Sequence, residues 1–104
     1  MKCKQMDIIY NIFDELSYKQ TVIAVDILRI LFNNRKQGMN IIELNRYFRN
    51  KYTHSVRSAV RWLKDMGYIT QADNDGIGMK YIITLAGIKK HWEIWGKLKR
   101  AAVI

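Results

Sequence analysis

The chain has 104 residues, 49% of them hydrophobic, and a formal net charge of +9. This length suits one domain and leaves no room for a separate catalytic domain. The single cysteine excludes an intramolecular disulfide and a cysteine-based metal cluster, and no run approaches the ~18 apolar residues of a membrane span. Polar residues interrupt the N-terminal segment, so we expect no signal peptide and a cytoplasmic protein in a reducing environment.

Apolar residues at helical spacing predict two helices in the first third of the chain. The first covers about Met6 to Leu16, and a polar break follows from Ser17 to Gln20. The second begins after a capping Thr21 and runs to about Asn34, with apolar residues over more than half of its circumference. We therefore expect an amphipathic N-terminal helix followed by a mostly buried one.

Two further helices are predicted between residues 40 and 66. Asn40 and Glu43 have the spacing of a capping box at the start of the third helix. Thr53 is expected to cap a fourth helix from about His54 to Met66, and Gly67 follows it where a left-handed residue often ends a helix. The residues expected to be buried are Ile41, Leu44 and Phe48 in the third helix, and Val56, Ala59, Val60 and Leu63 in the fourth.

A β-hairpin and a long helix complete the predicted order. Residues 68–71 and 79–83 have strand character, and Asp73-Asn74-Asp75-Gly76 between them has strong turn chemistry. Thr84 is expected to cap a last helix from about Leu85 to Ala102. The predicted fold class is mainly α with a small β-hairpin: a winged helix-turn-helix with extra N- and C-terminal helices. We expect a single domain, 1–104, with an N-terminal helix at 1–20, a core at 21–84 and a C-terminal helix at 85–104.

The positive charge is concentrated around the fourth helix. Residues 44–72 carry six basic side chains and one acidic side chain, a net charge of +5. Arg57, Arg61 and Lys64 lie at i, i+4 and i+7, so they share one side of the helix, opposite the predicted buried stripe. A charge cluster that coincides with a helix-turn-helix favours DNA binding over a merely solvated surface.

Short motifs extend this interpretation to a known family. They are Ile42-Glu43-Leu44, Ser55-Val56-Arg57, Leu63-Lys64-Asp65-Met66-Gly67-Tyr68-Ile69 and Tyr81-Ile82-Ile83-Thr84-Leu85-Ala86-Gly87. With these motifs, residues 40–90 resemble the winged-helix DNA-binding domains of prokaryotic transcription regulators, the MarR and PadR types among them. The resemblance implies that residues from about His54 to Lys64 contact the major groove, that the hairpin contacts the backbone, and that dimers bind paired half-sites.

Two features depart from that family. The hairpin turn is acidic, with Asp73 and Asp75, and only Lys80 offsets it. The chain is also shorter than a full MarR-type regulator, so we do not expect a small-molecule effector site. The small size and the Ile-, Lys- and Asn-rich composition would suit a regulator of a virus, plasmid or archaeon, acting in a prokaryotic or virus-infected cell close to its DNA.

The predicted DNA-binding residues are polar or basic and lie on or beside the two central helices. They are Thr53, His54, Ser55, Arg57, Ser58, Arg61 and Lys64 on the fourth helix, Arg46, Arg49 and Lys51 before it, and Lys80 in the hairpin. The predicted dimer contacts are apolar residues of the terminal helices, namely Ile9, Phe13, Leu85, Ile88, Trp92 and Trp95.

No motif predicts an enzyme, a cofactor or a metal. Gly76-Ile77-Gly78 lacks the rest of a phosphate-binding loop, and His54 and His91 lack neighbouring ligands. The sequence thus predicts a homodimeric, sequence-specific DNA-binding regulator, most simply a repressor. Two alternatives stay open: an architectural DNA-binding protein with little sequence preference, and a protein-interaction module. RNA binding is less favoured, because no aromatic-rich sheet platform is visible.

Overall fold

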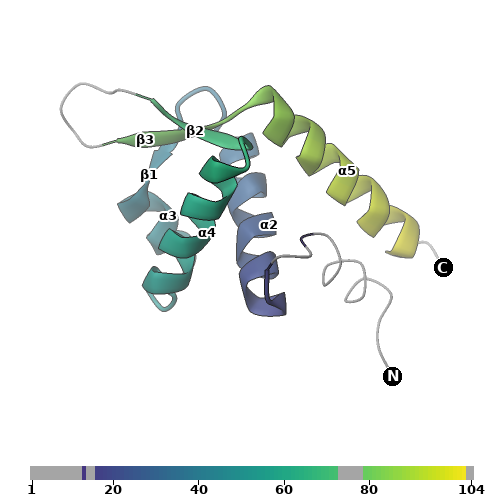
Figure 1. The fold of residues 1–104 in the computed structure, drawn as a ribbon, viewed down its shortest axis with the longest axis horizontal. Coiled ribbons are helices and arrows are strands. Elements are labelled where there is room, and N and C mark those ends of the chain that lie inside the picture. Colours follow the sequence, from purple (N-terminus) through teal and green to yellow (C-terminus); the bar gives the residue numbers. More distant parts are fainter. Residues whose placement is uncertain (1–12, 14–15, 73–78, 103–104) are drawn as a thin grey trace.

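The computed structural model describes residues 13, 16–72 and 79–102, with side chains up to residue 99 (Figure 1). The helices of this part are α2 (Tyr18–Asn33), α3 (Ile41–Tyr47), α4 (Thr53–Asp65) and α5 (Leu85–Ala102). The strands are β1 (Met39–Asn40), β2 (Ile69–Ala72) and β3 (Lys80–Ile83), and they form an antiparallel sheet in the order β1-β3-β2. The prediction of a mainly helical protein with a small hairpin is confirmed. The predicted N-terminal helix falls almost entirely outside the described residues.

Helix α2 begins earlier than the sequence predicted. The Ser17 side chain caps it by accepting a hydrogen bond from the Gln20 N–H at 3.2 Å. The predicted cap, Thr21, is instead a fully buried residue inside the helix. The polar break at residues 17–20 was therefore wrong, and the expected boundary at residue 20 falls inside α2. Ser17 and Thr21 are both good capping residues, and the burial of Thr21 in the core, together with the exposure of Ser17, places the cap at Ser17.

Helix α3 starts at the predicted capping box. Asn40 Oδ1 accepts from the Glu43 N–H at 2.8 Å, and Glu43 Oε1 accepts from the Asn40 N–H at 3.1 Å. The two residues just before the helix, Met39 and Asn40, also form β1, which the sequence analysis missed. They pair with Tyr81 and Lys80 of β3. A strand of two residues is too short to show a period of two in the sequence.

The turn between α3 and α4 is tight and left-handed. Arg49 and Asn50 have φ values of +55° and +57°, a region that residues other than glycine seldom adopt. Helix α4 then begins at Thr53, and its N-cap is Tyr52, which provides no side-chain hydrogen bond. The prediction of Thr53 as the cap was wrong by one residue. Gly67, with φ +82°, ends the helix region as predicted.

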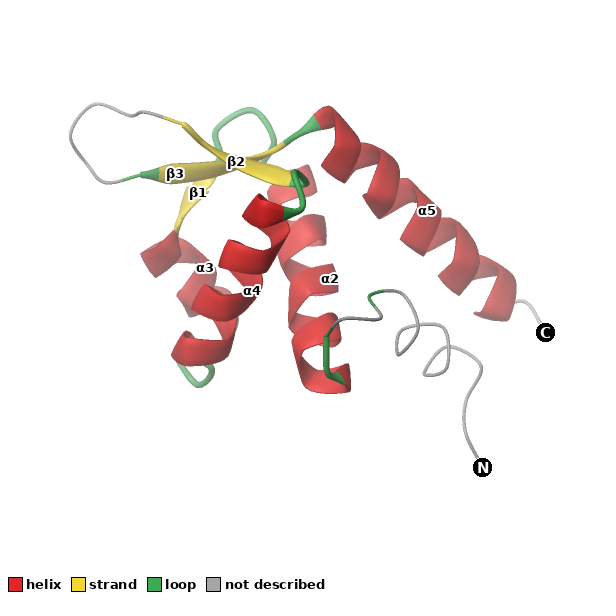
Figure 2. Cartoon of the chain, in the orientation of Figure 1, coloured by secondary structure: helices red, strands yellow, loops and turns green. Residues whose placement is uncertain are grey.

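Strands β2 and β3 form the predicted hairpin, and α5 is closely joined to its base. Thr84 caps α5 as predicted: its Oγ1 accepts from the Gly87 N–H at 3.1 Å. The same hydroxyl donates to the Gly67 carbonyl at 2.6 Å, and the Thr84 N–H donates to the Tyr68 carbonyl at 3.0 Å. Figure 2 shows the sheet across one end of the helices, with α5 leaving from that end. The end of α4, the base of the hairpin and the start of α5 therefore form one connected junction.

The core lies between α2, α4 and the inner face of the sheet. Its largest fully buried side chains include Ile27, Leu28 and Leu31 of α2, Leu63 of α4 and Ile69 of β2. The predicted buried stripe of α4 is confirmed, because Val56, Ala59, Val60 and Leu63 are all buried. Within the described residues, no helix combines the length and apolar character needed to cross a membrane.

Candidate nucleic-acid interface

Helix α4 presents two faces of opposite chemistry. One face packs on α2 and the sheet through the buried stripe. The other face carries Arg57 and Arg61, which are exposed, with Lys64 at its sheet-side edge. Because the apolar stripe fixes the rotation of the helix, these cations are held on the outer surface of the molecule.

The structure places most of the predicted DNA-binding residues on the surface around α4. The exposed ones are Thr53, His54, Arg57, Ser58, Arg61 and Lys64 on the helix, Arg46 in the last turn of α3, and Arg49 and Lys51 between α3 and α4. Ser55 is half-buried in the first turn, and Lys80 is half-buried at the start of β3. Arg49 is held in the left-handed turn, so its position depends on a strained backbone.

Surface hollows flank α4 on both sides. On the sheet side, a hollow of about 430 Å³ is lined by Ile41, Arg57, Val60, Arg61, Lys64, Asp65, Gln71 and Tyr81. On the other side, a hollow is lined by His54, Arg57, Ser58, Arg61, Trp62 and Asp65. Helix α4 is thus a ridge between two depressions, which is the shape needed to enter a groove of a duplex. Asp65 is the one acidic residue that lines them.

Two residues of the sheet-side hollow were missed by sequence reasoning. Gln71 Oε1 accepts a hydrogen bond from Lys64 Nζ at 3.1 Å, and Gln71 Nε2 donates to Tyr81 Oη at 3.4 Å. Lys64 is therefore tied to the hairpin as well as to α4. The signal that could have found these residues is the cross-strand register, in which Gln71 and Tyr81 lie directly opposite each other.

The predicted dimer contacts divide into three groups. Leu85, Trp92 and Trp95 of α5 are 70%, 56% and 36% exposed, and Ile88 is half-buried beside them. Phe13 was wrongly predicted as a dimer contact, because it is 3% exposed and packs edge-on against Trp62 with 4.8 Å between ring centroids. Ile9 lies outside the described residues.

His91 joins α5 to α2 at an aromatic cluster. Its ring is buried and stacks on Phe32 with 4.4 Å between centroids, and Trp92 and Trp95 lie at its edges. Burial lowers the pKa of His91, and the nearby Arg29 guanidinium lowers it further. Burial also raises the pKa of Asp26, although the Arg29 charge opposes this shift. His91 therefore serves to pack α5 against α2.

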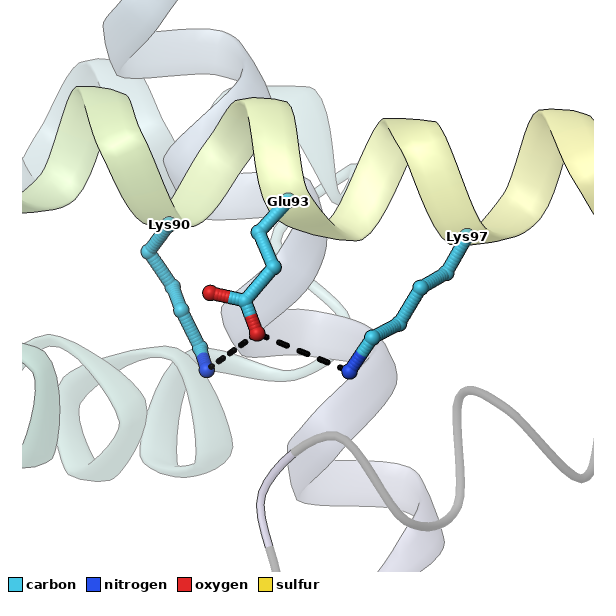
Figure 3. Close-up of polar contacts among 3 residues, drawn as sticks. All are labelled: Lys90, Glu93 and Lys97. Atoms are coloured by element: carbon cyan, nitrogen blue, oxygen red, sulfur yellow. Dashed lines mark hydrogen bonds and ion pairs between the residues drawn. The ribbon is translucent and has the colours of Figure 1, made fainter.

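Helix α5 carries a shared ion pair (Figure 3). Glu93 Oε1 lies 3.5 Å from Lys90 Nζ and 3.5 Å from Lys97 Nζ. The charge of Lys90 is the main cause that holds the pKa of Glu93 below its usual range, and Lys97 adds to it. These ion pairs link successive turns of one helix at a partly exposed position, and they have no catalytic geometry. Within the described residues, no three His, Cys, Asp or Glu side chains group as metal ligands.

No protein-family model matches the sequence, and no curated protein or solved structure matches it either.

Proposed function

We propose that the chain is a winged helix-turn-helix protein that binds double-stranded DNA and regulates transcription, with α4 as its recognition helix. In this proposal α3 and α4 are the helix-turn-helix, and β2 and β3 are the wing. The order α2-β1-α3-α4-β2-β3-α5 with a β1-β3-β2 sheet supports it, because it puts a short hairpin beside an exposed helix.

The observation that carries the proposal is the exposed cationic face of α4. Arg57, Arg61 and Lys64 project from the face opposite a fully packed stripe, and Asp65 alone opposes their charge on that face. An arginine in the major groove can hold the O6 and N7 atoms of guanine with two hydrogen bonds or bind a phosphate. Arg57 and Arg61 are the proposed anchors, and the polar residues at the start of α4 add backbone contacts.

We further propose that a homodimer forms through α5. The exposed Leu85, Trp92 and Trp95 form an apolar strip along α5, beside the residues of this helix that pack on α2. A second copy of the same helix would cover this strip and remove its apolar surface from water. A dimer would also set the spacing of two half-sites, and binding over a promoter would repress transcription by steric exclusion.

Fluorescence anisotropy with labelled duplex DNA tests the proposal. Replacing Arg57 or Arg61 by Ala is expected to weaken binding to a preferred sequence by about 1–3 kcal/mol if the residue holds a base edge. Lys89→Gln, on the exposed part of α5, is the control and leaves affinity unchanged. Unchanged affinity of both arginine variants would refute the assignment of α4.

Two alternative functions give different results in the same assay. An architectural protein would bind preferred and random duplexes equally, with a steep salt dependence. A protein-interaction module would show no DNA binding at ~100 mM salt, where a basic surface used for DNA should still bind. The cationic face of α4 favours DNA, and the apolar strip of α5 is the feature that would serve a protein partner.

A further inference from the structure

The hollow between α4 and the hairpin has the chemistry of an anion site. Three cationic side chains line it, Arg57, Arg61 and Lys64, together with the polar groups of Gln71 and Tyr81. We propose that this α4–hairpin hollow binds a phosphate group of the DNA backbone, with the Tyr81 hydroxyl as a direct ligand. The inference rests on the proposed DNA-binding function and adds to it the place where the backbone crosses the protein.

The sheet register explains why polar residues occur at this point of the hairpin. Ile69 and Ile83 are opposite each other in the ladder and buried, and Gln71 is opposite Tyr81 on the same face, one step nearer the turn. The inner face of the hairpin therefore changes from core residues to polar residues as it passes α4. Gln71 and Tyr81 mark the position where that face leaves the core and lines the hollow.

Two hydrogen bonds link Lys64, Gln71 and Tyr81 in the hollow, and the last group of this series, the Tyr81 hydroxyl, can still donate its own proton. Lys64 donates to the carbonyl oxygen of Gln71, whose amide nitrogen donates to the oxygen of Tyr81. Tyr81 Oη accepts this bond, so its own proton remains available to a further acceptor, and the ammonium of Lys64 has two more N–H donors. Among the described residues no hydrogen-bond acceptor takes the Tyr81 proton. An anion in the hollow could accept hydrogen bonds from both the Tyr81 hydroxyl and the Lys64 ammonium.

The charges of the lining favour a phosphate. Three cations oppose the single carboxylate of Asp65, so the lining has a net charge of +2. Ile41 and Val60 contribute apolar wall to the same hollow, which reduces the solvent screening of the charges. The sequence between β2 and β3 contains two aspartates, whose negative charge disfavours phosphate. The cationic hollow beside β2 and β3 is therefore the place where we expect the hairpin to contact the backbone.

Phosphate contact is independent of sequence, so a labelled duplex of random sequence is a sufficient probe. Anisotropy titrations between about 50 and 200 mM salt give both the affinity and its salt dependence. Tyr81→Phe keeps the ring and removes only the hydroxyl, and it should weaken binding about tenfold with no change of salt slope. Lys64→Gln removes a cation and should make the slope less steep by about 0.9.

Tyr47→Phe is the matched control, because Tyr47 is an exposed tyrosine of α3 that does not line the hollow. It should bind like the wild type. Circular dichroism confirms that each variant is folded. If Tyr81→Phe binds like the wild type while Arg57→Ala binds more weakly, the phosphate site is wrong and the proposed function stands. If the wild type binds neither this duplex nor any genomic DNA fragment, both are refuted.

Discussion

Gly87 sits at the junction of α5 with the hairpin, and replacing it by alanine tests how tightly that junction is packed. A Cβ atom at position 87 would overlap the Tyr68 carbonyl oxygen and lie 2.7 Å from Ile83 Cγ1. Carbon atoms in contact need about 3.5–4.0 Å, so Ile83 must move by about 1 Å. The Tyr68 carbonyl is backbone and accepts the Thr84 N–H at 3.0 Å, so moving it also disturbs this hydrogen bond.

Forced overpacking of this kind costs about 1–3 kcal/mol, and the upper end applies because one neighbour is backbone. Replacing glycine by alanine inside a helix would by itself stabilise the folded state by about 1 kcal/mol, because alanine has the higher helix propensity. We therefore expect Gly87→Ala to lower the free energy of unfolding by about 2 kcal/mol, measured by urea denaturation with far-UV circular dichroism. Gly67→Ala is the contrasting variant: no atom lies within 4 Å of its Cβ position, and the loss of about 1 kcal/mol comes from its φ of +82° alone. A Gly87→Ala protein as stable as the wild type would refute the close packing of α5.

Three more predictions concern α3 and α5. Because burial and Arg29 lower the pKa of His91, the unfolded chain binds a proton more readily than the folded one. The free energy of unfolding should therefore keep the full contribution of the uncharged His91 above about pH 6.5 and decrease as the pH falls below that value. Urea unfolding at several pH values measures this, and His91→Gln should lose that part of the pH dependence. Asn40→Ala removes the capping bond to Glu43 and should destabilise the protein by about 1 kcal/mol, whereas no change in the urea midpoint would mean that the capping box is dispensable. Trp92→Glu should convert a dimer to a monomer in light scattering after gel filtration; a mass unaffected by the change would place the dimer contact elsewhere.

Local chemistry in the sequence was sufficient to predict much of the fold. The capping box at Asn40, the buried stripe of α4 and the left-handed Gly67 were all confirmed, because each depends on residues within a turn or two of one another. The start of α2 and the strand β1 were not predicted. Both depend on contacts from elsewhere in the chain: burial of Thr21 in the core, and pairing of Met39 with Tyr81.

Helix α5 shows where a periodic pattern is ambiguous. Its sequence contains two apolar stripes at helical spacing, and the structure buries the one with His91 and Ile94 while Trp92 and Leu85 stay exposed. The close approach at Gly87 selects between them, because only a glycine lets that side of the helix meet the Tyr68 backbone. Such a tertiary contact leaves no periodic signal in the sequence.

The sequence was sufficient to predict the residues that α4 contributes to the candidate site, but not those that the hairpin contributes. The spacing of Arg57, Arg61 and Lys64 was enough to place the three on one face of a helix, and the structure exposes them. Gln71 and Tyr81 reach the same hollow through the register of the hairpin, and that register depends on the length of the turn and on the burial of Ile69. Sequence reasoning therefore found the charges and missed the neutral residues beside them.

The central claim, that α4 makes this chain a sequence-specific DNA-binding protein, is tested most directly by selecting genomic DNA fragments bound by the purified protein. The selection is carried out at about 150 mM salt, which suppresses non-specific phosphate binding. We predict recovery of a short palindromic motif, with recovery lost in the Arg57→Ala, Arg61→Ala double variant. Recovery of fragments without a common motif, or of no DNA, would contradict it.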